Sequence, residues 1–219
     1  MAGMNIGEIV FNTVVEQMIE KYRERRADRR RELAKKYGAD DVVFVHELVQ
    51  CPLKREFAAK YPEIDAASMY NPRFVVGQLI EDAVKLHLSS KMDLEEGYFD
   101  MVLEVGGKKI VVAGSSDIYI AGDSVVEVKY LTGMYSAPHD HHIKQLSIYL
   151  LLGGLDSGQL LQVSPEGIKS VEVGPATEEE LEKMVENLLN KTVAPLYEWE
   201  CKLCPYEFLC SRSVARERR

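Results

Sequence analysis

The sequence lacks any run of about eighteen apolar residues, the length that a membrane-spanning helix requires. It also lacks the basic leader segment of a secretory signal, because Glu8 comes early and no Lys or Arg precedes it. Internal repeats and low-complexity linkers are missing too. These absences favour a soluble, cytoplasmic globular protein. The contents of 46% hydrophobic and 28% charged residues agree with that expectation.

An excess of positive charge is absent as well. The formal net charge of −8 argues against a protein that coats nucleic acid through bulk charge. It does not exclude a nucleic-acid enzyme, because carboxylates that bind metal add negative charge and basic residues can be local. Residues 21–36 hold nine Lys or Arg against three acids, and residues 212–219 hold four Arg against one Glu. The first stretch is either a solvated helical face or a helix that contacts phosphates.

Cysteine is scarce, and its spacing is uneven. Cys51 stands alone, whereas Cys201, Cys204 and Cys210 form a C-x2-C-x5-C pattern. In a cytoplasmic chain such crowding indicates a metal site, holding zinc or an iron–sulfur cluster, rather than disulfides. Four unrelated buried cysteines are the alternative. Cys51 lies far upstream, but it precedes a proline, as Cys204 does, and a Cys-Pro step can end a loop and aim the sulfur.

The chain length of 219 residues fits one domain with an appendage, or two small domains. Hydrophobic periodicity predicts helices over 4–36, 46–60 and 140–152, with another beginning at Asn71-Pro72. A capping box at Thr177 and Glu180 predicts one more. Strands are expected over 42–45, 98–104, 108–113, 159–163 and 168–173. The expected apolar faces hold Ile6, Ile9, Val10, Val14, Met18 and Ile19 in the first helix, and Val76, Leu79, Ile80, Ala83, Val84 and His87 after Pro72.

Residues 114–131 read as two short β-branched strands around a turn at 121–124. With the preceding strands they predict a meander of at least three strands. Asp117 is expected on the first strand, opposite residue 127 or 128. Glu127 and Lys129 are two apart on the second strand, so both side chains share a face. Either the two carboxylates hold a divalent metal beside Lys129, or Lys129 forms a structural ion pair with one of them.

Other polar residues lie where they could reach the same region. Glu81 follows Gly77 by four residues, at the edge of an apolar helical stripe, and either points into a cavity or reaches solvent. Gln145 and Tyr149 are also four apart, and their helical face lines a cavity or faces solvent. The histidines at 139, 141 and 142 lack a helical metal-binding spacing and carry little weight as ligands.

Taken in order, Gly77-x3-Glu81, Gly114-x2-Asp117, Glu127-x-Lys129 and Gln145-x3-Tyr149 resemble the RecB-like branch of the PD-(D/E)xK nucleases. The framing cysteines resemble the iron–sulfur members of that branch, and the short chain is most similar to CRISPR-associated exonuclease family four. The resemblance covers residues 42–212. It implies a metal-dependent DNA exonuclease that processes DNA ends, single-stranded or free, during spacer acquisition in antiviral defence. CRISPR integrase proteins would be its partners.

The resemblance also implies roles for individual residues. Asp117, Glu127 and the backbone carbonyl of Val128 would bind Mg²⁺ or Mn²⁺, with Glu81 where many relatives carry histidine. Lys129 would orient the attacking water or offset charge on the phosphate. Gln145 and Tyr149 would position DNA, and all four cysteines, Cys51, Cys201, Cys204 and Cys210, would hold a 4Fe-4S or 2Fe-2S cluster.

The expected fold is therefore an α/β nuclease core with a mixed central β-sheet flanked by helices. We predict an N-terminal helical arm over 1–41, a core over 42–200 and an iron–sulfur loop with a basic tail over 201–219. Two other hypotheses stay open. The first is a non-catalytic subunit that binds DNA ends or partner proteins around a structural metal cluster. The second is a zinc-ribbon protein in which Glu127 and Lys129 form a structural pair.

Overall fold

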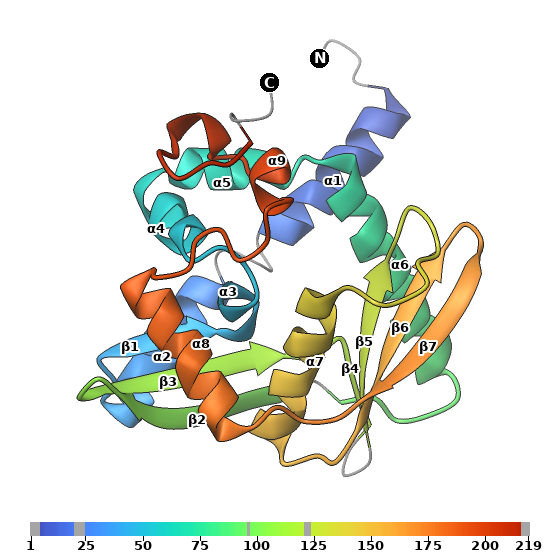
Figure 1. Cartoon of the computed structure of the whole chain (residues 1–219). Helices are drawn as coiled ribbons and strands as arrows, with labels where there is room; N and C mark the ends of the chain where they lie inside the picture. Colours follow the sequence, from blue (N-terminus) through green and yellow to red (C-terminus); the bar gives the residue numbers. More distant parts are fainter. Residues whose placement is uncertain (1–4, 20–24, 96, 121–123, 216–219) are drawn as a thin grey trace.

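The computed structural model describes residues 5–19, 25–95, 97–120 and 124–215, with side chains omitted at 18 and 19. Helices surround two small β-sheets, and α7 lies between the sheets (Figure 1). The elements, in order, are α1 (Ile6–Ile19), α2 (Arg25–Tyr37), β1 (Asp41–Phe44), α3 (Val45–Leu48), α4 (Leu53–Lys60), α5 (Pro62–Ser68), α6 (Pro72–Ser89), β2 (Tyr98–Val105), β3 (Lys108–Ser115), β4 (Ile118–Ile120), β5 (Ser124–Tyr130), α7 (Asp140–Gly153), β6 (Gly158–Ser164), β7 (Gly167–Val173), α8 (Glu178–Asn190), α9 (Glu200–Leu203) and η2 (Glu207–Leu209).

The first sheet has three strands in the order β1-β3-β2. β2 and β3 form the predicted antiparallel hairpin, with Val105 opposite Lys108. Gly106 and Gly107 make its turn at φ values of 59° and 74°, a region that glycine adopts without steric cost. β1 joins the other side of β3 in parallel. β3 is therefore the central strand, and its residues Ile110, Val111 and Val112 are fully buried.

The second sheet has four strands in the order β4-β5-β6-β7. β4 and β5 pair antiparallel, β5 and β6 pair parallel, and β6 and β7 form a hairpin that ends at Ser164 and Gly167. The predicted single meander is wrong, because β3 and β4 belong to different sheets. Ser116 and Asp117 form a bend between these strands, so the pairing does not continue across them. The predicted α/β class with mixed sheets is confirmed.

Two hydrophobic clusters hold α7 in place. Toward the first sheet, Ile148 and Tyr149 pack with residues of β1, β2, β3, α3 and α8. Toward the second sheet, Leu146 and Leu150 pack with residues of β5, β6 and β7. Because α7 buries apolar residues against both sheets, it fixes their relative placement. The polar side chain of Gln145 is carried on the same helix.

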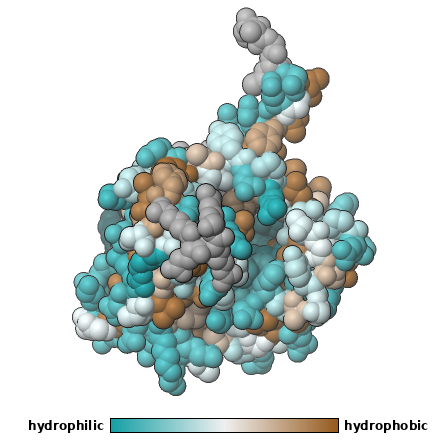
Figure 2. Space-filling view, turned by 45° about the horizontal axis from the view of Figure 1, so that its top comes forward, coloured by the Kyte–Doolittle hydropathy of each residue, from teal (hydrophilic) through white to brown (hydrophobic). Residues whose placement is uncertain are grey.

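The N-terminal segment forms two helices within the described residues. α2 docks Leu33 against Val42, Phe44 and Val111 of the first sheet. α1 packs through Val15 against Val75 of α6, with Phe11 and Val14 beside them. The predicted apolar stripe of α1 is only partly correct: Ile6, Ile9 and Val10 are exposed, and brown side chains mark the projecting end in Figure 2. The predicted helical continuity across 20–24, with the side chains of Met18 and Ile19, lies outside the described residues.

Two other helix predictions need correction. The helix expected over 46–60 divides into α3 and α4, and Cys51 lies in the break between them. Pro52 explains the break, since proline disfavours the helical conformation at the residue before it. On α6, Val75 and Gln78 are buried, whereas Val76, Leu79 and His87 are exposed. This rotation of the buried face turns Glu81 and Lys85 toward a cavity beside the second sheet.

The capping box that opens α8 is present, with Thr177 and Glu180 exchanging hydrogen bonds. α8 then covers the first sheet through Leu181, Val185 and Leu188. Within the described part of the chain, none of the helices is long and apolar enough to cross a membrane. The division into arm, core and C-terminal loop stays a prediction.

Candidate active site

A cavity of about 960 Å³ opens between α2, α6, the start of β2, the β3–β4 bend, β5 and α7. Every side chain predicted to be catalytic or to bind the divalent metal lines it, although these residues come from four separate parts of the sequence: Glu81, Asp117, Glu127, Lys129, Gln145 and Tyr149. A carboxylate, a lysine and an amide thus share one water-accessible space. The fold brings these predicted residues together.

The β4–β5 pairing sets the register of the two central acids. Ile118 is paired with Val126, so Asp117 lies one step beyond the strand end, at the level of Glu127. The backbone N–H of Val128 donates a 2.8 Å hydrogen bond to Asp117 Oδ2. The prediction of an Asp117 strand position is therefore wrong by one residue, because Asp117 belongs to the bend. Its proximity to residues 127 and 128 is as predicted. The turn expected at 121–124 falls largely outside the described residues.

Glu127 is 1% exposed, and only one of its oxygens has a hydrogen-bond partner within the described part of the chain. Its Oε1 accepts hydrogen bonds from Lys129 Nζ at 2.5 Å and from Gln145 Nε2 at 2.8 Å. Its Oε2 is buried with no hydrogen-bond partner among the described residues. Leaving a carboxylate oxygen unsatisfied costs free energy, about 1–3 kcal/mol or more. An oxygen held bare in this way is suited to a cation that the protein itself does not supply.

The charges of the site alter two pKa values strongly. Burial and the neighbouring Glu127 carboxylate raise the pKa of Asp117 to about 8, while Lys129 opposes the rise. Burial alone would lower the pKa of Lys129, but the Glu127 and Asp117 carboxylates raise it above its usual value. Lys129 therefore stays charged, and the two acids repel each other. A bound cation would relieve that repulsion.

Tyr149 packs unusually close to the first sheet. A Cβ at Gly114 would lie 2.5 Å from Tyr149 Cε1 and 2.9 Å from Val45 Cγ2, so only glycine leaves room for the ring. The Tyr149 hydroxyl accepts a 3.0 Å hydrogen bond from Gln145 Nε2. Burial, with the Glu127 charge, raises the pKa of Tyr149 well above its usual value. Tyr149 is thus a neutral hydroxyl that helps to hold Gln145 against Glu127.

Glu81 reaches the cavity from α6, as one of the two sequence interpretations expected. Lys85, one turn later, donates a 2.5 Å hydrogen bond to Glu81 Oε1 and lines the same cavity. Burial would lower the pKa of Lys85, but Glu81 and, more weakly, Asp117 raise it. Sequence reasoning missed Lys85, although its position four residues after Glu81 was a usable signal. One turn before Glu81, a Cβ at Gly77 would meet no atom of the described residues within 4 Å, so space remains beside this part of α6.

The donor atoms in the cavity are of the kind that binds a divalent cation, but they are not arranged as a complete coordination site. Carboxylate oxygens are the ligands that Mg²⁺ and Mn²⁺ prefer, and Glu127 Oε2 is free to serve as one. Within the ranges that the structure describes, no three His, Cys, Asp or Glu side chains are grouped closely enough to hold a metal ion. Ligation by Glu81, Asp117, Glu127 and the Val128 carbonyl stays a prediction.

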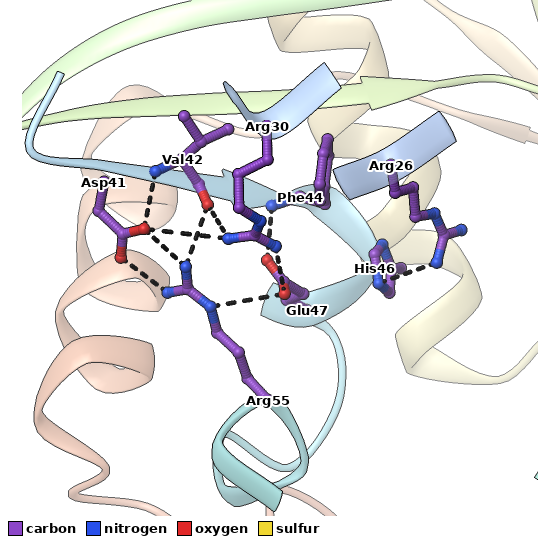
Figure 3. A network of polar contacts seen from close by, with 8 residues as sticks. All are labelled: Arg26, Arg30, Asp41, Val42, Phe44, His46, Glu47 and Arg55. Atoms are coloured by element: carbon purple, nitrogen blue, oxygen red, sulfur yellow. Dashed lines mark hydrogen bonds and ion pairs between the residues drawn. The ribbon is translucent and has the colours of Figure 1, made fainter. Parts of the chain in front are cut away.

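A basic wall faces the carboxylates. Arg25, Arg26 and Arg29 of α2 line the cavity together with His46. Arg26 Nη1 lies 3.2 Å from His46 Nε2, and burial with the nearby arginine charges lowers the pKa of His46 well below its usual value (Figure 3). His46 is therefore neutral, and Nε2 accepts a hydrogen bond from the guanidinium. The sequence patterns predict no role for His46. In the tertiary structure its ring holds the Arg26 guanidinium in position.

An ion-pair network anchors this wall to the first sheet (Figure 3). Arg30 donates to the Val42 carbonyl and, at 2.8 Å, to Glu47 Oε1. Arg55 of α4 binds both oxygens of Asp41 at 2.8 and 2.6 Å. Glu47 is 6% exposed, and its other oxygen accepts from the Phe44 backbone. The acids of this network are paired with arginines of both α2 and α4. The network therefore fixes the position of α2 and of the three arginines that it directs to the cavity.

The four cysteines converge in a second, small cavity of about 20 Å³. Burial raises the pKa of the Cys51 and Cys204 thiols. Beside them Glu200, which is 2% exposed, accepts a 2.9 Å hydrogen bond from the Cys51 backbone N–H and pairs with Lys54. The fold therefore brings Cys51 to the C-terminal cysteines, as the Cys-Pro similarity suggested. The thiols are free within the described chain, and the cluster that they would hold stays a prediction.

Comparison with known proteins gives one curated relative. The chain is 27% identical over 177 residues to the CRISPR-associated exonuclease Cas4 of Saccharolobus solfataricus, a match that covers 78% of this chain and 88% of that protein. No family model matches the sequence.

A solved structure shows the same fold. The crystal structure of SSO0001 aligns over 98% of this chain and 100% of its own, with a TM-score of 0.83 and 24% sequence identity. The alkaline exonuclease LHK-Exo from Laribacter hongkongensis aligns over 77% of this chain and 91% of its own, with a TM-score of only 0.43 at 13% identity. The predicted resemblance is confirmed: the chain is similar in sequence to a CRISPR-associated exonuclease of the Cas4 kind and shares the fold of SSO0001.

Proposed function

We propose that the protein is a metal-dependent DNA exonuclease that hydrolyses phosphodiester bonds. The observation that carries the proposal is the meeting of three carboxylates, a charged lysine and a glutamine in one cavity whose opposite wall is basic. The curated relative is itself described as a CRISPR-associated exonuclease. An ion pair that served stability alone would not require the unpartnered Glu127 Oε2.

Asp117 and Glu127 would hold Mg²⁺ or Mn²⁺, with Glu81 and the Val128 carbonyl as further ligands. When bound, such a cation neutralises the phosphate and lowers the pKa of a coordinated water. Lys129 supplies a fixed positive charge beside Glu127, where a scissile phosphate would gain negative charge. Gln145, held by Tyr149, orients the Glu127 carboxylate so that Oε2 stays directed away from the amide.

The basic wall provides the DNA contact. Arg25, Arg26 and Arg29 present guanidinium groups to the cavity, and guanidinium binds phosphate oxygens with two hydrogen bonds at once. Arg26 is held by His46, and α2 is anchored by Arg30 to Glu47. A phosphate chain between this wall and the carboxylates would come within reach of these guanidinium groups despite the net charge of −8.

The four converging cysteines would hold an iron–sulfur cluster, 4Fe-4S or 2Fe-2S, that ties residue 51 to residues 201–210. A brown protein with visible absorption and bound iron is the expected result. A colourless protein that contains zinc instead would contradict the cluster and favour the zinc-ribbon hypothesis for the cysteine loop, without affecting the nuclease proposal.

The curated relative is named a CRISPR-associated exonuclease, which supports a role in a CRISPR system. We propose, from the resemblance of the sequence motifs, that this role is spacer acquisition, with DNA ends, single-stranded or free, as substrate and integrase proteins as partners. Co-purification of this chain with CRISPR integrase proteins would test the partnership. If the two do not associate with or without DNA, the spacer-acquisition role fails and the nuclease activity is tested separately.

The decisive experiment uses end-labelled single- and double-stranded DNA with Mg²⁺ or Mn²⁺. We expect Asp117→Asn and Lys129→Ala to lower the cleavage rate by about 100-fold or more while DNA binding persists. Lys183→Ala is the matched control, because Lys183 makes a similar 2.6 Å contact with Glu179 on the exposed face of α8. Calorimetric titration with Mn²⁺ should show weaker binding for Asp117→Asn.

One result would contradict the nuclease proposal. If the folded wild-type protein binds DNA but cleaves neither strand type with either ion, the chain is a non-catalytic DNA-end or partner-binding subunit. The carboxylate–lysine group would then be a structural ion pair.

A further inference from the structure

Six rings gather at the start of α7, and none of them lines the proposed catalytic cavity. They come from the loop before α7, from its first turn and from the segment before α9, and we refer to them as the ring cluster: Tyr135, His139, His141, His142, Tyr197 and Trp199. The two segments are more than fifty residues apart in sequence. Their contact joins the start of α7 to the segment that leads into the C-terminal cysteines (Figure 1).

The rings contact one another continuously. Centroid distances are 4.7 Å from Tyr135 to His139, 5.5 Å from His139 to His141 and 5.1 Å from His141 to Trp199. Tyr197 stacks on Trp199 at 5.8 Å with an interplanar angle of 20°. These separations lie in the range of stacked and tilted aromatic pairs. The cluster is therefore one ordered series of π faces.

The two ends of the cluster face solvent. Trp199 is 45% exposed and Tyr135 is 44% exposed, which are large values for side chains of this size in contact with other rings. His142 is more enclosed, and its Nδ1 has no hydrogen-bond partner within the described part of the chain. The interior rings thus support the outer ones, whose remaining faces are open to a ligand.

His141 and His142 act as neutral rings near pH 7. Burial, together with the charges of His139 and Lys129, lowers the pKa of His141 to about 4. Burial, Lys129 and His141 lower the pKa of His142 to about 2. The cluster therefore offers flat aromatic surface.

The position of the cluster relates it to the active site. His142 lies one turn before Gln145 on α7, and the Lys129 charge reaches both His141 and His142. Lys144 Nζ lies 5.8 Å from the centre of the Tyr197 ring, so a cation accompanies the flat surface. Planar rings with an adjacent cation are the features by which proteins bind single-stranded nucleic acid, since each base stacks and each phosphate is neutralised.

We propose that the ring cluster binds unpaired bases of single-stranded DNA, which stack on Trp199 and Tyr135, beside the site of cleavage. This inference rests on the proposed nuclease function, because it supplies the strand that the carboxylates would cut. Bases paired in a duplex have no free face, so the cluster would favour single strands or frayed ends.

Trp199 is the single tryptophan in the sequence, so its fluorescence reports on this surface directly. The Asp117→Asn protein, without divalent metal, is titrated with a thymidine oligonucleotide and with an abasic oligonucleotide of equal length and charge. We expect saturable quenching by the first and none by the second. Equal quenching by both would overturn the proposal, because phosphate contacts alone would then account for binding.

Variants separate a ligand-binding role from a structural one. Tyr135→Ala and Trp199→Ala should each weaken binding of the thymidine oligonucleotide about tenfold, measured by anisotropy, and leave binding of the abasic one unchanged. Trp199→Phe keeps a ring and should retain most of the affinity. Phe74→Ala is the matched control, since Phe74 is a 56% exposed aromatic residue on α6 outside the cluster. If Tyr135→Ala and Trp199→Ala match wild type in binding, the rings only brace the cysteine loop and the proposal is wrong.

Failure of the nuclease proposal and failure of the ring-cluster proposal give different results. A wild-type protein that never cleaves DNA, yet shows base-dependent Trp199 quenching, would keep the ring cluster as a DNA site and remove the catalytic function. Cleavage that is unaffected in rate and strand preference by both ring variants would keep the nuclease and overturn the ring cluster.

Discussion

At the residue scale, the site depends on side chains that are constrained from two directions. Glu127 is buried, and one oxygen is occupied by Lys129 and Gln145 while the other is left bare. Gln145 in turn is held by Tyr149, whose ring occupies space that any residue other than glycine at 114 would fill. A single missing Cβ on β3 therefore helps to set the position of the Glu127 carboxylate on β5, the predicted metal ligand.

We predict that Gly114→Ala destabilises the protein by about 1–3 kcal/mol, because the new methyl group would overlap Tyr149 and Val45. Cleavage should fall as well, since a displaced Tyr149 no longer supports Gln145. Urea unfolding and the end-labelled DNA assay measure the two effects.

Gly77→Ala is the matched control for that substitution. Its Cβ meets no atom within 4 Å and lies inside α6, so alanine should stabilise the protein by about 0.5–1 kcal/mol. Equal effects at the two glycines would contradict the steric explanation for Gly114.

At the element scale, α7 carries three different surfaces. Leu146 and Leu150 face the second sheet, Gln145 and Tyr149 face the cavity, and His141 and His142 at its start enter the ring cluster. The enclosed histidines have a measurable consequence for stability, because their folded-state pKa values lie below the ordinary value of 6.5.

We predict that the contribution of His141 and His142 to stability falls as the pH is lowered from about 7 toward 5. In this window the unfolded chain binds protons at His141 and His142, whereas the folded chain does not, so protonation favours unfolding. For His142 the loss between pH 7 and pH 5 is at most about 2 kcal/mol.

His142→Gln should flatten this dependence. The measurement is urea unfolding of both proteins at pH 7 and pH 5, where wild type should lose more stability than the variant. Parallel losses would mean that other groups, such as carboxylates of the ion-pair networks, control the acid side.

At the scale of the whole molecule, the segment that carries the C-terminal cysteines packs against a part of the chain far upstream in sequence. The break between α3 and α4 presents Cys51 to Cys201, Cys204 and Cys210, and Glu200 binds the Cys51 backbone across 149 positions of sequence. A cluster held by all four thiols would add a covalent link to that hydrogen bond.

We predict that Cys51→Ser removes the visible absorption and lowers the melting temperature, because the C-terminal loop loses its attachment. Limited proteolysis should then cut within residues 195–215 faster than in wild type. Absorbance, iron content and the rate of that cut are the measurements.

Glu56→Ala is the comparison variant. Glu56 pairs with Lys191 at 2.7 Å and links α4 to the end of α8, but both side chains are exposed, so its loss should cost no more than about 1 kcal/mol. If Cys51→Ser is no less stable than Glu56→Ala and keeps its iron, the cysteines are not joined by a cluster.

Sequence patterns alone predict the residues of the site and most of the elements around it. Local patterns are enough for the β2–β3 hairpin, the capping box of α8 and the face shared by Gln145 and Tyr149, because each depends on residues a few positions apart. The ordered set of acids, Lys129 and cysteines likewise predicted a nuclease-like fold and named the residues that line its cavity.

Packing between distant elements sets how the strands are divided between the two sheets and which residues hold the site in place. The separation of β3 from β4 into different sheets, the solvent exposure of His87 and the inward turn of Lys85 depend on packing between distant elements. The same holds for His46 behind Arg26 and for the ring cluster at the start of α7. Their free energies come from contacts across long sequence separations, which periodicity and spacing along one chain do not encode.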